Sequence, residues 1–168
     1  GVDLKIDEGP ETPPSRLTLL AQSREGYRHL CELLTRAYLK GQDRGQVLCR
    51  REWVEEKAEG LIALSGGMAG DTGAALLAGK PELADAAARH WQSVFGDRYY
   101  LELTRCGRAG ESAWLSETVA LALRHDIPVV ATNDVRFPTA DDFDAHEARV
   151  AIHGGYTLAD PRRPRHYT

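Results

Sequence analysis

Paired cysteines, long apolar runs and an excess of positive charge are all missing from this chain of 168 residues. The three cysteines, Cys31, Cys49 and Cys106, are widely spaced and form no CxxC pair, so neither a disulfide framework nor a zinc knuckle is expected. No apolar run approaches the ~18 residues that a membrane-spanning helix needs, and no signal peptide is recognisable. These absences predict a cytoplasmic protein with reduced thiols and no membrane partner.

The charge balance argues against a free-standing nucleic-acid-binding protein. The formal net charge is −4 and the isoelectric point is near 5.9, whereas free-standing nucleic-acid-binding proteins are usually basic. Basic residues do gather near the C-terminus, at Arg162, Arg163 and Arg165. A solvated surface loop explains this group at least as well as contact with DNA does.

Several catalytic and ligand-binding motifs are absent or incomplete. There is no GxSxG nucleophile elbow. The glycine-rich stretch 65–70 lacks the ending of a P-loop and the spacing of a dinucleotide fingerprint, so a tight turn is favoured over phosphate binding. His146 and His153 stand seven residues apart on one expected helix. That is about 10.5 Å along the axis at ~1.5 Å per residue, too far for one metal ion to reach both.

What is present suits an ordinary globular domain of the α/β class. Hydrophobic residues make up 42% of the chain and charged residues 27%, and the length allows one domain with a sizeable core. In the second half, strand and helix patterns alternate, which predicts a parallel sheet or barrel. The expected strands are 2–6, 16–21, 61–64, 99–104 and a short buried strand that begins at Val129. The expected helices are 23–39, 51–57, 72–78, 81–95, 111–125 and 143–153.

The first long helix illustrates how these boundaries are chosen. Ser23 is a suitable N-cap. The apolar residues follow the spacing of one helix face, which predicts a buried stripe made of Tyr27, Leu30, Leu34 and Tyr38. The segment 41–45 is expected to be a polar break.

Polar residues follow the ends of several expected strands. Cys106 comes after strand 99–104, and Asp134 and Arg136 come after the Val129 strand. The carboxyl ends of parallel strands meet at one edge of a sheet, so these residues and Asp3 could face a common mouth. A carboxylate and a thiolate are possible metal ligands, but Arg136 would repel the ion. A structural role for these four residues is therefore favoured over catalysis.

The sequence resembles the polymerase-and-histidinol-phosphatase (PHP) domain of the bacterial replicative DNA polymerase III alpha subunits. The resemblance runs nearly end to end and rests on several stretches taken together, namely 17–21 with Gly26, Tyr27 and Leu30, then 59–67, 97–103, 128–137 and 142–153. It implies part of a distorted seven-stranded (β/α) barrel. Residues 1–168 would supply the middle and later part of the domain. The His-x-His metal motif would precede Gly1, and the palm, fingers and thumb would follow Thr168.

The resemblance also implies what became of the family's metal site. Its ligand positions fall at Asp3, Cys106, Asp134 and Arg136, where two expected histidines are replaced by a thiol and a guanidinium. Losing two ligands removes much of what a multinuclear cluster needs. These positions are therefore expected to be vestigial, with no catalytic residue and no bound metal in this chain.

Three hypotheses about function stay open at this point. The favoured one is a catalytically inactive scaffold within a DNA-directed DNA polymerase. It would dock the proofreading exonuclease subunit and meet DNA through the parent enzyme, whose active site would use magnesium. The second is an active metal-dependent PHP phosphoesterase, either a 3′–5′ exonuclease or a pyrophosphatase. The third, without the resemblance, is a small nucleotide or phosphate binder that uses the turn at Gly66–Gly70.

Overall fold

The computed structural model describes residues 1–9, 12–43 and 45–163. The chain divides into two compact units, Gly1–Thr132 and Asn133–Thr168. Each unit is considered separately below. No helix in the described ranges is long and apolar enough to cross a membrane.

The first unit is built on a six-stranded mixed sheet with the strand order β5-β1-β2-β6-β7-β8. The neighbours β6, β7 and β8 are parallel, as are β1 and β5, while β2 is antiparallel to both β1 and β6. The strands are β1 (Val2–Asp7), β2 (Ser15–Ala21), β5 (Cys49–Arg50), β6 (Leu61–Leu64), β7 (Tyr99–Thr104) and β8 (Val129–Thr132). This mixed α/β arrangement is compatible with part of a (β/α) barrel.

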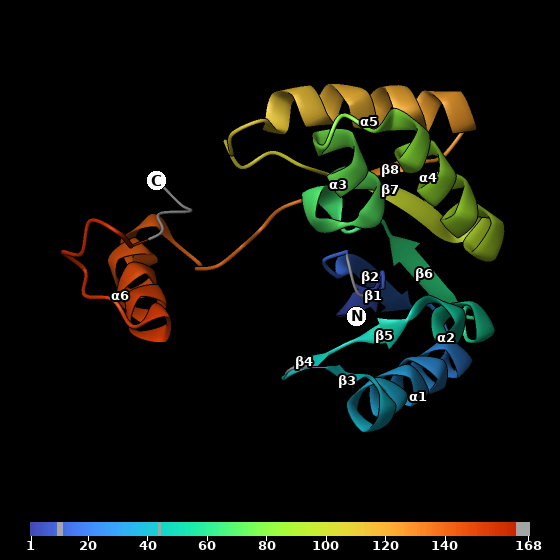
Figure 1. Ribbon diagram of the computed structural model, residues 1–168, viewed down its shortest axis with the longest axis horizontal. Coiled ribbons are helices and arrows are strands. Elements are labelled where there is room, and N and C mark those ends of the chain that lie inside the picture. The colour runs from blue at the N-terminus through green and yellow to red at the C-terminus, as the bar shows by residue number, and fades with distance from the viewer. Residues whose placement is uncertain (10–11, 44, 164–168) are drawn as a thin grey trace. The chain divides into compact units, whose positions relative to one another are not determined.

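Five helices accompany this sheet, namely α1 (Arg24–Lys40), α2 (Arg51–Glu56), α3 (Asp71–Leu77), α4 (Pro81–Phe95) and α5 (Glu111–His125). Figure 1 shows α1 and α2 beside β5 and shows α3, α4 and α5 around β7 and β8. Short 3₁₀ turns at Gly67–Ala69 and Gly96–Arg98 lead into α3 and β7. The expected boundaries of α4 and α5 are confirmed.

The core lies on one face of the sheet because side chains alternate along each strand. On β1, Leu4 and Ile6 are buried, and Leu4 pairs with the equally buried Leu17 of β2. Large side chains from the helices complete the same cluster, including Leu33, Trp91, Phe95 and Leu121. The opposite face is polar, as the pairs Asp3–Thr18 and Lys5–Arg16 show.

The buried face of α1 differs from the expected stripe. Ser23 is the N-cap, and its hydroxyl accepts a hydrogen bond from the Gly26 N–H at 3.0 Å. However, Tyr27 and Tyr38 are 62% and 60% exposed. The residues that the helix buries are Gly26, His29, Leu30, Leu33 and Ala37.

The physical reason is a close backbone approach at Gly26. A Cβ atom at this position would lie 1.8 Å from the Gly60 carbonyl oxygen, so the helix can approach the turn before β6 only through a glycine. This contact rotates the core-facing stripe by about one residue. A pattern that counts only large apolar residues misses the small ones that make such contacts.

Two smaller expectations are also corrected. The strand β8 is not buried, because Val129 is 47% exposed and the strand forms one edge of the described sheet. The expected polar break at 41–45 contains the start of a small hairpin, in which β3 (Gln42–Asp43) pairs with β4 (Gln46–Val47).

In the second unit, a 3₁₀ turn (Ala140–Asp142) leads into α6 (Phe143–Gly154). Thr139 and Asp142 form a capping box at the start of the turn. The rings of Phe137, Phe143 and His146 pack together, with centroid distances of 6.0 Å and 5.2 Å from Phe137. A shielded ion pair joins Glu147 to Arg163, which holds the segment after α6 against the helix.

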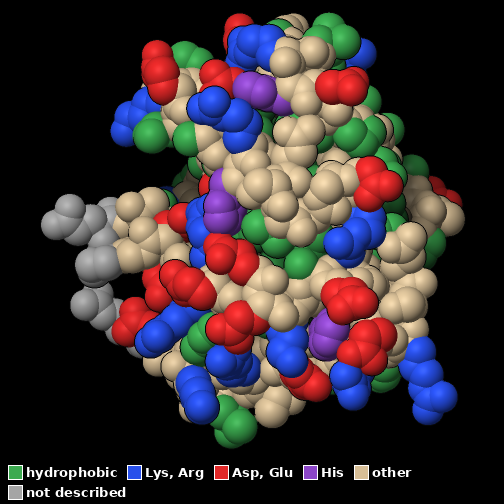
Figure 2. Space-filling model, turned by 90° about the vertical axis from the view of Figure 1, so that its right-hand side faces the viewer, with side chains coloured by type: hydrophobic (Ala, Val, Ile, Leu, Met, Phe, Trp, Pro, Cys, Tyr) green, Lys and Arg blue, Asp and Glu red, His purple; other side chains and the backbone are tan. Residues whose placement is uncertain are grey.

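The surface shown in Figure 2 carries Lys and Arg side chains interspersed with Asp and Glu side chains. Charges of opposite sign alternate there over short distances. This face therefore has no extended basic field of the kind that a DNA-binding surface presents.

Candidate functional site at the carboxyl edge of the sheet

The register of the strands brings several polar groups to one edge of the first unit. Because β6, β7 and β8 are parallel, their last residues lie at the same edge. Because β2 is antiparallel to β6, its first residues lie there as well. The side chains at this edge include Arg16, Ser65, Glu102, Thr104 and Thr132.

Arg16 holds the glycine-rich turn after β6. Its Nε and Nη2 atoms donate to the Gly66 carbonyl oxygen at 3.0 Å and 2.8 Å. Gly66 has a φ of 77°, and a Cβ atom there would lie 2.1 Å from the Arg16 carbonyl oxygen. Glycine is therefore required at this position for close packing and a left-handed backbone conformation.

The same turn carries little support for phosphate binding. Asp71 opens α3, and its Oδ1 atom accepts a hydrogen bond from the Thr72 N–H at 2.6 Å. This carboxylate therefore occupies the position where the partial positive charge of the helix would attract an anion. Close packing accounts for the glycines, and the phosphate-binder hypothesis stays a prediction.

A partly buried hydrogen-bond network links the ends of three strands. Thr132 on β8 donates to Glu102 Oε1 at 2.7 Å and lies 2.9 Å from the Thr104 hydroxyl. The Glu102 N–H donates to the Ser65 hydroxyl at 2.9 Å. Glu102 is only 7% exposed. The network fixes the relative positions of β6, β7 and β8 just before the residues that the sequence marked as a possible site.

Sequence reasoning missed Glu102 as a member of this group. A signal was available, because Glu102 and Thr104 alternate with Leu101 and Leu103 on one strand. Such alternation indicates that a strand presents a polar face.

The loop after β7 is shaped by the first residue of α5. The N–H groups of Cys106 and Gly107 donate to the two carboxylate oxygens of Glu111, each at 2.8 Å. The Cys106 N–H foremost, together with those of Gly107 and Arg108, holds the pKa of the shielded Glu111 carboxyl below its usual value. Cys106 itself is exposed. This loop is therefore fixed through its backbone while the side chain of Cys106 faces solvent.

The other three expected positions have different surroundings. Asp3 Oδ1 accepts a hydrogen bond from the Thr18 hydroxyl at 2.6 Å on the polar face of the sheet. Asp134 and Arg136 belong to the second unit, where Arg136 Nε lies 2.8 Å from Asp134 Oδ1. This last pair is a direct ion pair. That all four face one mouth stays a prediction.

These donors do not fit the multinuclear metal centre of the metal-binding members of the family that the sequence resembles. Within the described ranges, no group of three or more His, Cys, Asp or Glu side chains is placed to hold a metal ion. The guanidinium of Arg136 already pairs with one oxygen of the Asp134 carboxylate, and a cation there opposes binding of a second cation. His146 packs against Phe137 and contacts Arg149 at 3.3 Å, as expected for a residue with a local structural role. Of the terminal basic residues, Arg165 lies outside the described residues.

Comparison with known proteins places the chain in a family. A PHP domain is matched over residues 1–106. The chain is 48% identical to the DNA polymerase III subunit alpha of Pseudomonas aeruginosa over 169 aligned residues, which covers 100% of the chain and 14% of the relative. It is 49% identical to the protein of the same name from Escherichia coli K12, and 48% identical to that of Vibrio cholerae. Each of these two alignments covers 92% of the chain and 13% of the relative.

The chain thus spans about a seventh of the length of these relatives, 14% in the first case. The match to the PHP domain covers β1, β2, β5, β6 and β7 of the sheet and ends at Cys106, which was expected at a former metal position. The resemblance deduced from the sequence is confirmed. The chain belongs to the PHP domain family.

Proposed function

We propose that this chain is part of a replicative DNA polymerase alpha subunit, in which it acts as a catalytically inactive scaffold that docks the proofreading exonuclease subunit. Similarity over all or nearly all of this chain to polymerase subunits supports the parent enzyme, a DNA-directed DNA polymerase. In this proposal, magnesium and the nucleotidyl-transfer chemistry belong to other parts of the polymerase polypeptide. DNA is met through the parent enzyme.

The observation that carries the inactive assignment is the ion pair between Asp134 and Arg136. The guanidinium Nε lies 2.8 Å from the carboxylate Oδ1, and an arginine keeps its positive charge at any physiological pH. A divalent ion at Asp134 would have to displace this cation and then remain beside it. Electrostatic repulsion between the two positive charges opposes such binding.

Other shielded acidic residues serve the architecture rather than catalysis. We define the Arg51 cluster as Glu8, Arg51, Asp71 and Trp91. Arg51 Nη2 lies 2.7 Å from Glu8 Oε2 and 3.2 Å from Asp71 Oδ2. The Trp91 indole N–H donates to Asp71 Oδ2 at 2.8 Å, and the Arg51 guanidinium stacks on the Trp91 ring at 4.9 Å. This cluster joins the end of β1 to the starts of α2 and α3 and to α4, which is what a rigid scaffold requires.

The test uses the whole polymerase polypeptide that contains this sequence. We expect the purified protein to carry no stoichiometric zinc or manganese by elemental analysis. We also expect no hydrolysis of single-stranded DNA or pyrophosphate beyond that of an Asp134→Ala variant. The polypeptide should elute together with the purified exonuclease subunit in size-exclusion chromatography.

The competing hypothesis is an active PHP phosphoesterase. Bound metal in the wild type, together with hydrolysis that Asp134→Ala abolishes, would establish that alternative and refute the inactive scaffold. Independent elution of the two subunits would refute the docking role.

A further inference from the structure

A cavity of about 570 Å³ is lined by α3, by α4 and by the loop residues 12–14. The apolar part of its lining consists mostly of small side chains that recur every three or four residues, so each helix presents one apolar face to it. These side chains are Ala74, Ala75 and Ala78 on one side and Leu83, Ala86 and Ala87 on the other. A mostly apolar cavity of this volume with a few polar groups is typical of a site for a small organic ligand.

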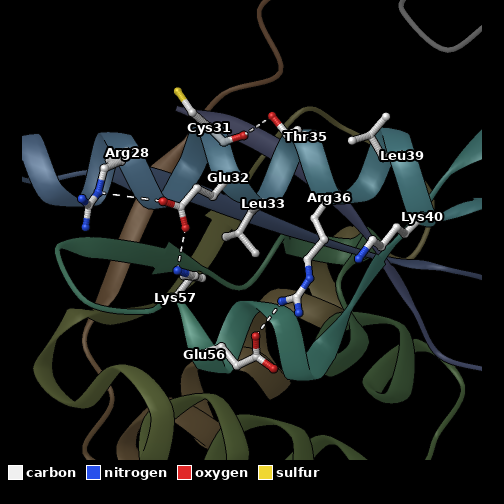
Figure 3. Close-up of a pocket in the computed structure, with 10 residues that line it drawn as sticks. All are labelled: Arg28, Cys31, Glu32, Leu33, Thr35, Arg36, Leu39, Lys40, Glu56 and Lys57. Atoms are coloured by element: carbon white, nitrogen blue, oxygen red, sulfur yellow. Dashed lines mark hydrogen bonds and ion pairs between the residues drawn. The ribbon is translucent and has the colours of Figure 1, made fainter.

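The groove along α1 has a similar volume, about 630 Å³, but is less suited to a ligand. Figure 3 shows two ion pairs across it. Arg36 pairs with Glu56 and Lys57 pairs with Glu32, each at 2.6 Å. Leu33 at the floor of the groove is buried. Most charges of the α1 groove are therefore neutralised within the protein, and little apolar surface is left for a ligand.

The polar part of the cavity between α3 and α4 includes three members of the Arg51 cluster, namely Glu8, Arg51 and Asp71. Glu8 accepts hydrogen bonds from Arg51 and from the Ser15 hydroxyl. Asp71 accepts hydrogen bonds from Arg51 and from the Trp91 indole N–H. A cationic ligand would gain little from carboxylates that already have these donors. Two carboxylates and one guanidinium leave a net negative charge, which opposes a ligand with several negative charges.

Lys80 is the cation of this cavity that has no carboxylate beside it. It lies in the turn between α3 and α4, where its N–H donates to the Ala75 carbonyl oxygen at 2.9 Å. Its exposed side chain lines the cavity and forms no ion pair among the residues that the structure describes. His90 also lines the cavity, but its Nε2 atom lies 3.1 Å from Glu55 Oε1. The ammonium group of Lys80 can therefore donate its hydrogen bonds to a ligand.

We propose that the cavity between α3 and α4 binds a small organic acid with a single carboxylate and an apolar body. The carboxylate pairs with Lys80, and the apolar body lies between the two alanine-rich helix faces. Burial of the apolar body supplies most of the affinity, whereas Lys80 selects for the negative charge. A phosphorylated compound fits less well, because its second negative charge would be repelled by the Arg51 cluster.

The experiment measures the affinity of the whole polymerase polypeptide for two probes of the same shape, 2-naphthoate and the uncharged 2-naphthalenemethanol. Ligand-observed saturation-transfer NMR gives the dissociation constants. Lys80→Ala removes the cation, and Lys40→Ala in the last turn of α1 is its control. Ala86→Trp fills the cavity, and Ala113→Trp on α5 is its control because both alanines are exposed.

We expect the wild type to bind 2-naphthoate more tightly than the alcohol. Lys80→Ala should weaken 2-naphthoate binding about fivefold, as loss of an exposed ion pair does, and should leave binding of the alcohol unchanged. Ala86→Trp should weaken both probes roughly tenfold or more, because the apolar body can no longer be buried. Both control variants should bind like the wild type.

Three results would overturn the proposal. The first is that the wild type binds neither probe, as when another part of the polypeptide fills the cavity. The second is that binding survives Ala86→Trp, which would place the probes elsewhere. The third is that Lys80→Ala affects the two probes equally, which would remove the role of the carboxylate. None of these results bears on the scaffold function, which is tested separately by metal content and by co-elution.

A second measurement covers the case in which Ala86→Trp does not fold. The wild-type polypeptide is irradiated with a 2-naphthoate derivative that carries a diazirine, and the labelled peptides are identified by mass spectrometry. Labelling within residues 71–90 that excess 2-naphthoate suppresses is expected. Labelling that is confined to other segments would contradict a site between α3 and α4.

Discussion

The Arg51 cluster and the Asp134–Arg136 pair both join a guanidinium to a carboxylate, but they differ in how far they are withdrawn from water. The Arg51 side chain is 24% exposed and that of Asp71 is 12% exposed. In the Asp134–Arg136 pair, 47% of the Arg136 side chain is exposed. Buried ion pairs are costly to break by removing one partner, whereas exposed pairs contribute little. Burial, and not the chemistry of the pair, therefore decides which one the fold depends on.

Removal of the Arg51 guanidinium is the largest effect that we expect. Arg51→Ala leaves Glu8 and Asp71 close together without their cation, and it removes the stacking on Trp91. The free energy of unfolding should fall by about 3 kcal/mol. Urea denaturation followed by tryptophan fluorescence measures this change.

Arg51→Lys is the matched control for this substitution. It keeps the charge but lacks the planar group that contacts two carboxylates and a ring at once. The free energy of unfolding of Arg51→Lys should therefore lie between those of the wild type and Arg51→Ala. A destabilisation by Arg51→Ala below about 0.5 kcal/mol, the usual range for surface substitutions, would show that the cluster does not support the fold.

Thiol reactivity reports on burial beside the Arg51 cluster without any substitution. Cys49 lies two residues before Arg51 and is buried, and burial raises the pKa of its thiol to about 11. The thiolate is the reactive form, and an ordinary cysteine has a pKa near ~8.5, so Cys49 should react roughly 100-fold or more slowly. Ellman's reagent should modify the exposed Cys31 and Cys106 rapidly and Cys49 only after unfolding. Rapid modification of all three thiols in the folded protein would contradict the buried position of Cys49.

Loss of the Glu111 carboxylate, which holds the loop that carries Cys106, should reduce stability by an intermediate amount. Its pKa is lower in the folded chain than in the unfolded chain. Its stabilisation is therefore fully present above the pKa of an unfolded glutamate and is lost as the pH falls toward the folded value. Glu111→Gln should cost about 1 kcal/mol at neutral pH and should make stability less dependent on pH in the acidic range. An unchanged acid-unfolding curve would show that the loop does not depend on this carboxylate.

Features that depend on local sequence could be predicted, whereas features that depend on contacts between distant residues could not. The boundaries of α4 and α5 follow from local signals, such as Pro81 at the first helical position. The strands β6, β7 and β8 were recognisable from short apolar runs. The buried face of α1 was not, because it depends on the contact between Gly26 and the distant Gly60.

The candidate site shows the same limit. Cys106, Asp134 and Arg136 could be singled out because they come within a few residues of recognisable strand ends. The Arg51 cluster was missed because Glu8 and Arg51 are separated by 43 positions in the chain, and no local spacing connects them. Glu111 was recognised as the start of a helix, but its contacts with the preceding loop depend on a turn that sequence periodicity does not describe.

The smallest expected effect on stability concerns Arg136. Because this side chain is half exposed, Arg136→Ala should change the free energy of unfolding by less than about 1 kcal/mol. The substitution also removes the cation beside Asp134, so it tests whether that cation alone prevents metal binding. Calorimetric titration of the whole polymerase polypeptide with manganese should still detect no site attributable to Asp134, because the described residues offer no set of three metal ligands. An Asp134→Ala, Arg136→Ala double variant is the control. Manganese binding that appears with Arg136→Ala and disappears in the double variant would show that a working metal site lies behind the ion pair.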